Sequence, residues 1–553
     1  MKPLRWLAEN DFRFPAVMIV YFAVHVIVRG MLSSSLTYDE AEQVYLSQGW
    51  QIGYNGQPPL YTWLQIPLLA IIGKASFALP LLKNVFLFLT YVCVYFAVAR
   101  ATANRFAGIV ASAAMLTMPQ IAWESHRDLS HTVAALFAAS WLMLAIVNVH
   151  KRPTMANYAV IGLATAAGLL FKYNFAVVLV AFIAAGLSIE DFRKRMLGPR
   201  ILFSIAIAAV LIGPHFWWAI EHLDTASSKA LTQLLPTEAM SLGDRVSTGL
   251  IRLAGSTFSC CSVTIAVFAI AFRDHWLKWV WKPKPNAKTT TEPTTEPIAV
   301  ASTDFVATTK LIERSMIGIA VVLLTLVMSG HAVETKNHWL QPFLFLLPTY
   351  LVLRLTPFVD RRSGYSTGSV VSQIGGARIV TTAGIFAAVV LTVLIGRTVS
   401  ASVRGDYSWL NMPFDRVAEH VAALPDTPEL IVATNVRFAG NLKAHFGKTP
   451  VATIADLKTD SRLQEAVESG VVLLIFESAD YTADVRLQNG HAPMELQSYE
   501  TRLPYRYGKE SDGHLFRFCQ FRKSDKVAVV AEADQSQPAE KSGPTRSSVH
   551  LQR

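Results

Sequence analysis

Residues 37–45 read TYDEAEQVY, and they come shortly after an apolar run that begins FPAVMIVYFAVHVIV at residue 14. Three carboxylates, Asp39, Glu40 and Glu42, therefore lie within four positions where the chain has just left a strongly apolar segment. Ionisable groups next to hydrocarbon are costly, which makes them functional candidates by default. A structural role is also open to Asp39, because an acidic residue near the N-terminus of a short helix stabilises that helix.

The composition is that of a membrane protein. Of the 553 residues, 52% are hydrophobic and 16% are charged, whereas about 25% are charged in an average soluble protein. The mean hydropathy is +0.34. The first apolar run is too long for a cleavable signal peptide, and further runs follow it. These features exclude an ordinary soluble enzyme and predict an α-helical polytopic membrane protein.

Eleven apolar runs are predicted to cross the membrane. They lie at 14–32, 79–99, 106–122, 131–149, 156–171, 174–188, 201–220, 248–272, 315–331, 339–355 and 379–399. Alternate connections between them are rich in Lys and Arg, which identifies the cytoplasmic side. These basic residues are Lys2, Arg5, Arg13, Arg100, Arg105, Lys151, Arg152, Arg193, Lys194, Arg195, Arg200, Arg273, Lys278, Lys282, Lys284, Lys288, Arg361, Arg362 and Arg378.

The odd number of spans then puts the residues after about 400 outside the cell, in the periplasm of a Gram-negative host. The net charge of +10 follows this topology and does not indicate a nucleic-acid groove. The predicted organisation is a transmembrane domain over 1–400, a small α/β periplasmic domain over 401–523 and a disordered tail over 524–553. A Pro/Thr-rich cytoplasmic linker is predicted at 280–309. The four cysteines fit no disulfide framework.

Five outer connections collect polar residues on one face of the membrane, at 37–45, 124–131, 171–174, 221–224 and 331–338. Cations such as Arg127, Lys172 and Lys336 suit a phosphate, and a nearby carboxylate suits deprotonation of a hydroxyl. This combination favours transfer of a sugar from a lipid phosphate carrier. Structural explanations stay open: Arg127 and Asp128 pair with each other or with headgroups, and Lys172 extends from a helix end to the interface.

YDEAEQVY at 38–45 and GYNGQPPLYTWLQ at 53–65 resemble membrane glycosyltransferases of GT-C type. The most similar group is the protein-mannosyltransferase-like superfamily, which includes bacterial lipid A aminoarabinose and galacturonic acid transferases. The resemblance implies an α-helical polytopic fold of GT-C type, with about eleven transmembrane helices and a small C-terminal α/β extracytoplasmic domain. It also implies inverting transfer from a polyprenyl-phosphate sugar without a cofactor.

The resemblance also implies roles for single residues. Asp39 matches the acidic residue of the first outer loop, the general base or acceptor-positioning group, and Glu40 adjoins it. We expect Glu42 to be an ordinary solvated side chain. Asp128 matches a second acidic residue of the family, and Lys172 matches a lysine between the fifth and sixth spans. The substrate-binding set implied by the motif and by the outer connections is Tyr61, Arg127, Asp128, Lys172, Lys336 and His338.

One position departs from the family pattern. Aminoarabinose transferases typically have Lys before Pro-Pro-Leu, and this chain has Gln57. The carrier phosphate must therefore be neutralised by other cations, among which we expect Arg127 and Lys172. The spacing of the acidic and histidine residues at 331–338 matches no metal signature, so we predict no metal site there.

The predicted function is inverting transfer of a sugar from a polyprenyl-phosphate carrier to a hydroxyl of an envelope glycolipid, lipid A or lipopolysaccharide core. The predicted location is the inner membrane, with the active site facing the periplasm. Two alternatives stay open. One keeps the fold and changes the acceptor to a protein hydroxyl. The other is a secondary transporter or lipid flippase, although such proteins carry their polar residues at mid-membrane and often contain inverted repeats.

Overall fold

The computed structural model describes residues 2–128, 130–227, 240–273, 303–363, 370–457, 472–476, 485–489, 492–494, 498–521 and 528–531. The chain forms two compact units. Unit 1 consists of residues 1–23, 51–61 and 83–390. Unit 2 consists of residues 24–50, 62–82 and 391–553. Each unit therefore combines segments that are far apart in the sequence.

Most of the described residues before 405 are helical. The α-helices are α1 (Lys2–Glu9), α2 (Arg13–Leu32), α3 (Tyr38–Leu46), α4 (Leu60–Ile72), α5 (Ala75–Thr102), α6 (Arg105–Ala114), α7 (Ser125–Arg127), α8 (Ser130–Lys151), α9 (Met155–Phe171), α10 (Phe175–Ser188), α11 (Glu190–Met196), α12 (Ile201–Glu221), α14 (Leu242–Ala271), α16 (Thr303–Met328), α17 (Asn337–Leu344), α18 (Leu346–Ser363), α19 (Val370–Val399) and α20 (Ala401–Arg404). Between α6 and α7 lie the 3₁₀-helix η1 (Met115–Thr117) and the π-helix η2 (Gln120–Glu124).

Seven helices in the described part of the chain are long and apolar enough to cross a membrane, and two bent helix pairs raise this number to nine. The bent pairs join 105–117 to 120–127 and 175–188 to 190–196. The predicted span at 156–171 corresponds to the shorter helix α9, and the one at 339–355 is divided between α17 and α18. A polytopic α-helical membrane fold is thus confirmed, and the count of eleven spans stays a prediction.

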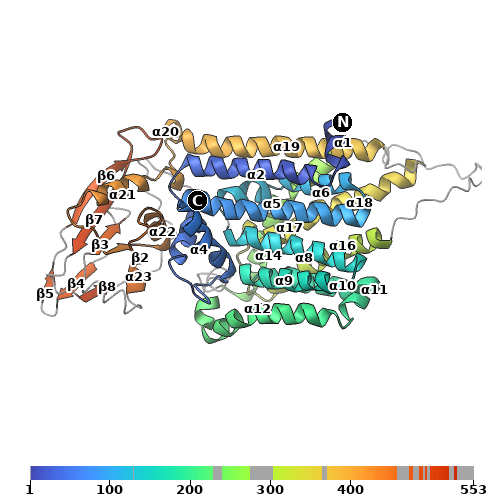
Figure 1. The fold of residues 1–553 in the computed structure, drawn as a ribbon, viewed down its shortest axis with the longest axis horizontal. Helices are drawn as coiled ribbons and strands as arrows, with labels where there is room; N and C mark the ends of the chain where they lie inside the picture. The colour runs from blue at the N-terminus through green and yellow to red at the C-terminus, as the bar shows by residue number, and fades with distance from the viewer. Residues whose placement is uncertain are drawn as a thin grey trace, which may run out of the picture. The chain divides into compact units, whose positions relative to one another are not determined.

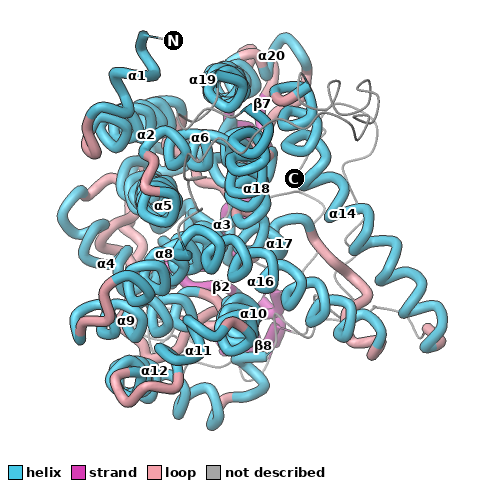
Figure 2. The backbone as a smooth tube through the Cα atoms, turned by 90° about the vertical axis from the view of Figure 1, so that its right-hand side faces the viewer, coloured by secondary structure: helices cyan, strands magenta, loops and turns pink. Residues whose placement is uncertain are grey.

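In unit 1, helix α9 lies between α8 and α12, as both views of the backbone show (Figures 1 and 2). The helix begins after Thr154, whose side chain accepts a hydrogen bond from the backbone N–H of Asn157. Close packing of α9 against α12 depends on Gly162, because a Cβ there would lie 2.6 Å from the carbonyl oxygen of Ser204. Small residues allow such close backbone approach between membrane helices.

In unit 2, the C-terminal part of the chain forms a five-stranded mixed sheet in the order β2-β1-β3-β7-β6. Its strands are β1 (Leu430–Ala433), β2 (Val451–Thr453), β3 (Val472–Phe476), β6 (Ser498–Pro504) and β7 (Gly513–Phe521). Strand β1 is parallel to β2 and β3, whereas β7 is antiparallel to β3 and β6. A second sheet has the order β5-β4-β8, with β4 (Val485–Asn489), β5 (Ala492–Met494) and β8 (Ala528–Ala531).

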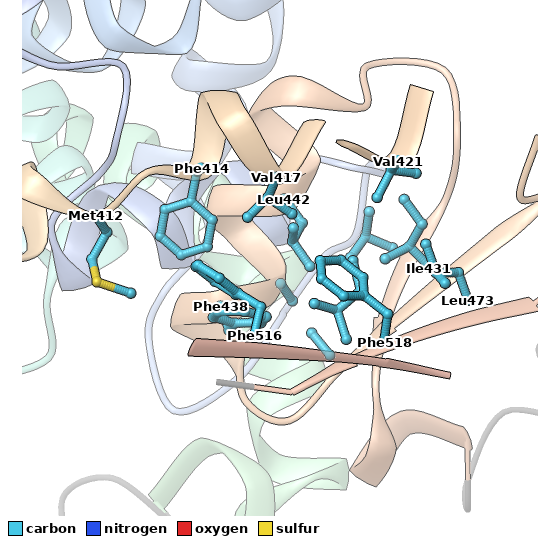
Figure 3. Packing of buried hydrophobic residues seen from close by; sticks show 14 of the residues in the cluster. Met412, Phe414, Val417, Val421, Ile431, Phe438, Leu442, Leu473, Phe516 and Phe518 are labelled. Carbon is cyan, nitrogen blue, oxygen red and sulfur yellow. The ribbon is translucent and has the colours of Figure 1, made fainter. Parts of the chain in front are cut away.

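Helices α21 (Phe414–Ala422), α22 (Val436–His445) and α23 (Ile454–Leu457) accompany the large sheet, and the 3₁₀-helix η3 (Trp409–Asn411) precedes them. Aromatic residues from helices and strands meet in its core, where Phe414, Phe438 and Phe516 are fully buried (Figure 3). The small α/β domain expected from the alternating strand-like and helix-like segments is therefore present.

Some predicted segments fall partly outside the described residues. The helix-like stretch at 461–470 lies outside them, as does the predicted linker up to residue 302. From Thr303 the chain is helix α16. Of the predicted tail, the structure describes the short strand β8.

Candidate active site

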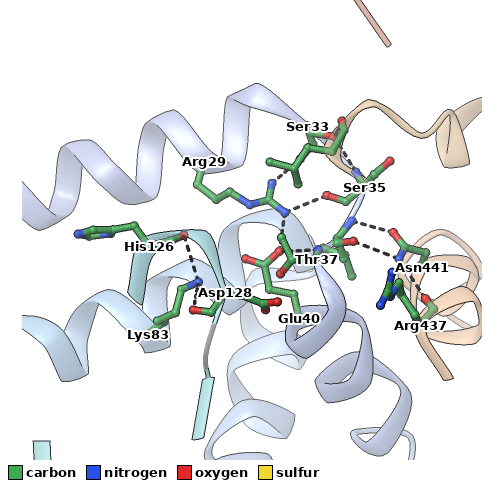
Figure 4. Close-up of polar contacts among 12 residues, drawn as sticks. Arg29, Ser33, Ser35, Thr37, Glu40, Lys83, His126, Asp128, Arg437 and Asn441 are labelled. Atoms are coloured by element: carbon green, nitrogen blue, oxygen red, sulfur yellow. Dashed lines mark hydrogen bonds and ion pairs between the residues drawn. The ribbon is translucent and has the colours of Figure 1, made fainter. Parts of the chain in front are cut away.

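The acidic stretch that follows the first apolar helix forms helix α3 in unit 2. Thr37 is its N-cap, and Thr37 and Glu40 form a capping box in which Glu40 Oε2 accepts a hydrogen bond from the Thr37 N–H at 3.1 Å (Figure 4). This arrangement satisfies backbone donors at the helix start. Thr37 and Glu40 thus form the capping box, and Asp39 also lies in the first turn of the helix.

Glu40 also forms a buried ion pair. Arg29 donates to Glu40 Oε2 at 2.6 Å, and the two side chains are 11% and 2% exposed. The Arg29 guanidinium donates in addition to the carbonyl oxygens of Ser33 at 2.9 Å and Ser35 at 2.8 Å. Arg29 therefore connects the end of helix α2, the following turn and helix α3. These contacts favour a positioning role for Glu40, and the catalytic role stays a prediction.

The three carboxylates of this stretch differ in environment. Asp39 is half-buried. Glu42, which we expected to be solvated, is only 5% exposed, so that expectation was wrong. The reason is that α3 lies inside unit 2, where its residues Ala41 and Val44 pack with Leu36 and with apolar residues of α5.

In unit 1, the segment that begins at Glu124 is largely helical, although the sequence predicted a loop there. The π-helix η2 leads into α7, and Asp128 follows in an extended conformation. Arg127 pairs with Glu124 at 3.1 Å, within the same helical segment. Asp128 lies two residues before the start of α8. π-Helical turns of this kind occur frequently at functional sites.

A buried lysine that the sequence did not single out lies next to Asp128. Lys83, on helix α5, is 2% exposed. Its ammonium group donates to the carbonyl oxygens of Asp128 at 3.3 Å and His126 at 3.4 Å (Figure 4). A lysine within an apolar span is costly and is therefore a functional candidate by default. Its contact with the backbone of Asp128, a predicted substrate-binding residue, strengthens that interpretation.

Elsewhere in unit 1, the lysines Lys172 and Lys336 lie near His338. The pKa of His338 is lowered to about 3, mainly by burial and further by the charges of Lys172 and Lys336. Lys172 donates to Thr132 Oγ1 at 2.6 Å, and the neighbouring Asn174 donates to the carbonyl of Trp339 at 3.3 Å. Segments 171–174 and 336–339 are thus adjacent, and they bring the two lysines of the predicted substrate-binding set near each other.

Tyr61 lies close to the same region of unit 1. Its ring is fully buried and contacts His131 at a centroid distance of 5.2 Å. His131 Nδ1 in turn lies 3.0 Å from the carbonyl oxygen of Phe171, the residue before Lys172. The Pro-Pro-Leu-Tyr motif therefore contacts the start of α8 through Tyr61, and His131 connects this position to the end of α9.

Within unit 1, the loop that carries Gln57 is held to helix α12 by a histidine that the sequence also did not indicate. His215 Nδ1 donates to the carbonyl oxygen of Ile52 at 2.9 Å, and His215 Nε2 lies 2.9 Å from the Tyr173 hydroxyl. A Cβ on Gly53 would overlap the ring of Trp218 at 2.1 Å. His215 and Trp218 on α12 thus determine the path of this loop.

The predicted site residues are therefore divided between the units. Asp39 and Glu40 belong to unit 2, and the other six belong to unit 1. Within unit 1, Lys172, Lys336 and His338 are brought together, and Asp128 is brought beside Lys83. Among the described residues, no group of three or more His, Cys, Asp or Glu side chains could hold a metal ion.

Known proteins resemble this chain over most of its length. A family model described as dolichyl-phosphate-mannose-protein mannosyltransferase matches residues 56–218. The lipopolysaccharide core galacturonosyltransferase RgtB of Rhizobium johnstonii is 31% identical, over 79% of this chain and 82% of RgtB. RgtA of the same organism is also a lipopolysaccharide core galacturonosyltransferase. It is 28% identical over 92% of this chain and 96% of the RgtA chain.

The fold is also found in a solved structure. ArnT from Cupriavidus metallidurans, bound to undecaprenyl phosphate, superimposes with a TM-score of 0.54 over 91% of this chain and 97% of ArnT, at 11% identity. The membrane fold expected from the acidic first loop and the Pro-Pro-Leu-Tyr motif is thus the one observed. The chain belongs to the family of RgtB, and it is a multi-span membrane glycosyltransferase of the GT-C type.

Proposed function

We propose that this protein transfers a galacturonosyl residue from a polyprenyl-phosphate carrier to a hydroxyl of the lipopolysaccharide core, at the periplasmic face of the inner membrane. The observation that carries the proposal is the similarity to RgtB along most of both chains. The lipid-linked donor is supported by the undecaprenyl phosphate bound to ArnT, which has the same fold. The orientation follows from the basic residues of the alternate connections.

The proposed reaction is a single displacement at the anomeric carbon. The acceptor hydroxyl gives its proton to the Asp39 carboxylate, and its oxygen bonds to the anomeric carbon. The bond between that carbon and the phosphate oxygen breaks, and polyprenyl phosphate leaves with the electron pair. The anomeric configuration is therefore inverted. Stabilisation of the developing phosphate charge is the larger contribution to such a step.

A uronosyl donor carries two separate negative groups, the carrier phosphate and the sugar carboxylate. Unit 1 offers two separate cationic positions. We assign Lys172 and Lys336 to the phosphate, because two cations beside a neutral histidine suit a phosphodiester that gains a second negative charge as it leaves. We assign Lys83, beside Asp128, to the sugar carboxylate. Arg127 is a weaker candidate for either group, because its guanidinium already pairs with Glu124.

The proposal is tested with the purified protein in liposomes that contain polyprenyl-phosphate galacturonic acid and lipopolysaccharide core oligosaccharide still linked to lipid A. The expected result is a new glycolipid whose mass is larger by one uronosyl residue, and Asp39→Asn should suppress it. Transfer to an added periplasmic protein without glycolipid product would support the protein-acceptor alternative. Movement of the donor across the bilayer without a new glycosidic bond would support the flippase alternative.

A further inference from the structure

We propose that helix α22 of the C-terminal domain positions the catalytic carboxylate Asp39, with Gly440 and Asn441 as the positioning residues. This inference rests on the proposed role of Asp39 as general base. It gives the C-terminal domain a part in the transfer reaction besides any contact with the acceptor. All the contacts that carry it lie within unit 2.

The first contact is a backbone-to-backbone approach between α22 and α3. A Cβ added to Gly440 would lie 1.9 Å from the carbonyl oxygen of Ala41 and 2.8 Å from its Cα. No side chain fits at such distances, so any substitution of Gly440 must move one helix away from the other. Ala41 lies two residues after Asp39 on a helix of nine residues. A displacement there therefore moves Asp39.

The second contact fixes the residue that precedes the N-cap of α3. Asn441 is fully buried, and its Oδ1 accepts a hydrogen bond from the Leu36 N–H at 2.7 Å (Figure 4). Its amide nitrogen donates to the Leu36 carbonyl at 3.3 Å and to the Arg437 carbonyl at 3.0 Å. The amide thus satisfies both backbone groups of a loop residue, and it attaches this residue to α22.

Further contacts connect the same domain to the whole stretch around Asp39. Before α3, the hydroxyls of Ser33 and Ser35 donate to the carbonyl oxygens of Leu410 and Met412, each at 2.6 Å. After it, the Gln48 side chain exchanges two hydrogen bonds with the backbone of Val451, at 2.9 and 3.0 Å.

The tyrosines near the two ends of α3, Tyr38 and Tyr45, also contact residues of the C-terminal domain. Tyr45 donates to the Asp456 carboxylate and packs against the aromatic core of the domain. The Arg437 guanidinium lies 4.7 Å from the ring centre of Tyr38, a cation–π contact on the residue next to Asp39. Helix α3 is therefore held by α22 and its neighbours on one side, and by the Arg29–Glu40 ion pair on another.

The test compares Gly440→Ala with Gly447→Ala, a substitution in the same domain where an added Cβ meets nothing within 4 Å. Displacement of a catalytic group by about 1 Å costs on the order of 100-fold in rate. We expect Gly440→Ala to lower kcat about 100-fold and to leave KM for the donor nearly unchanged. Gly447→Ala should behave like the wild type. If Gly440→Ala folds poorly, Asn441→Ala should give the same pattern with a smaller loss.

A double-substitution cycle separates positioning from general damage. If Gly440 acts through Asp39, adding Gly440→Ala to Asp39→Asn should cause little further loss, because the group being positioned is already disabled. If the loss of activity in the double variant equals the product of the two single-variant losses, the proposal is overturned. The proposal is also overturned if the activity of Gly440→Ala falls only in proportion to the amount of folded protein.

Amide hydrogen exchange gives a readout that does not depend on catalysis. Gly440→Ala should accelerate exchange over residues 36–46, and Gly447→Ala should not. Unchanged exchange in Gly440→Ala contradicts the positioning role even if the wild type is active. Accelerated exchange in Gly440→Ala, together with a wild type that transfers no sugar, would instead count against the proposed function and leave the contact between the helices established.

Discussion

Arg29 and Glu40 form an ion pair at 2.6 Å that connects the end of the first membrane helix to the helix that carries Asp39. The pair is nearly excluded from water, and Glu40 completes the capping box of α3 at the same time. Two neighbouring carboxylates thus have different environments: Glu40 is buried in an ion pair and a capping box, and Asp39 is half-buried. Their substitutions should therefore have different consequences.

Glu40→Gln should reduce stability strongly. Removing one partner of a buried ion pair leaves an uncompensated charge and costs about 3 kcal/mol. The matched control is Glu334→Gln, because Glu334 pairs with Arg252 where the two side chains are 41% and 47% exposed. An exposed pair contributes less than about 1 kcal/mol. Thermal denaturation of the detergent-solubilised protein measures both, and equal losses would contradict the structural role of Glu40.

Asp39→Asn should lower kcat by about 10² to 10⁴, the usual contribution of a general base. The Asp39 side chain lies outside the capping box of Thr37 and Glu40, and Asn keeps its size and one acceptor oxygen, so the melting temperature should fall less than in Glu40→Gln. The measurement is transfer of radiolabelled sugar in liposomes, with the melting temperature recorded in parallel. An active Asp39→Asn variant with a normal pH profile would remove Asp39 from the mechanism.

The sequence predicted the parts of the site whose signal is local. The acidic stretch after the first apolar run and the Pro-Pro-Leu-Tyr motif indicated the GT-C fold, which is confirmed. The positions of Lys172 and Lys336 on one face followed from counting spans, since connections that alternate across a membrane share a side. The structure brings both lysines next to His338.

Other features depend on contacts between distant segments and could not be predicted. Glu42 was expected to be solvated, but α22 covers α3 from about 400 positions further along the chain. Lys83 was not predicted as a site residue, because a single lysine hardly changes the mean hydropathy of the apolar run that contains it. Only the fold brings it beside Asp128, which follows helix α7.

Lys83→Met should change donor selectivity. If the ammonium binds the sugar carboxylate, its loss removes a charged hydrogen bond worth about 1.5 to 3 kcal/mol, or roughly 10- to 100-fold. Transfer of galacturonic acid should therefore fall by that factor, and transfer of galactose from the same carrier should fall much less. Lys172→Met is the control. Both donors carry the same phosphate, so transfer of galacturonic acid and transfer of galactose should fall by the same factor in this variant. Equal losses in Lys83→Met would contradict the assignment.

His338 should make the protein sensitive to acid. Burial, with Lys172 and Lys336 nearby, lowers the pKa of His338 to about 3, whereas an unfolded histidine titrates near its ordinary value of 6.5. Between these values the unfolded state binds the extra proton, so the free energy of unfolding falls as the pH falls, by up to about 1.4 kcal/mol per pH unit. At pH 7 and above this penalty is absent.

The measurement is the melting temperature of the solubilised protein between pH 4 and pH 8. His338→Gln should flatten the decline below pH 6.5, because glutamine takes up no proton in either state. His331→Gln is the matched control, since the His331 side chain is exposed and its ring nitrogen bonds Ser329 at 3.0 Å. A His338→Gln variant that loses stability on acidification as steeply as the wild type would mean that other groups cause the acid sensitivity.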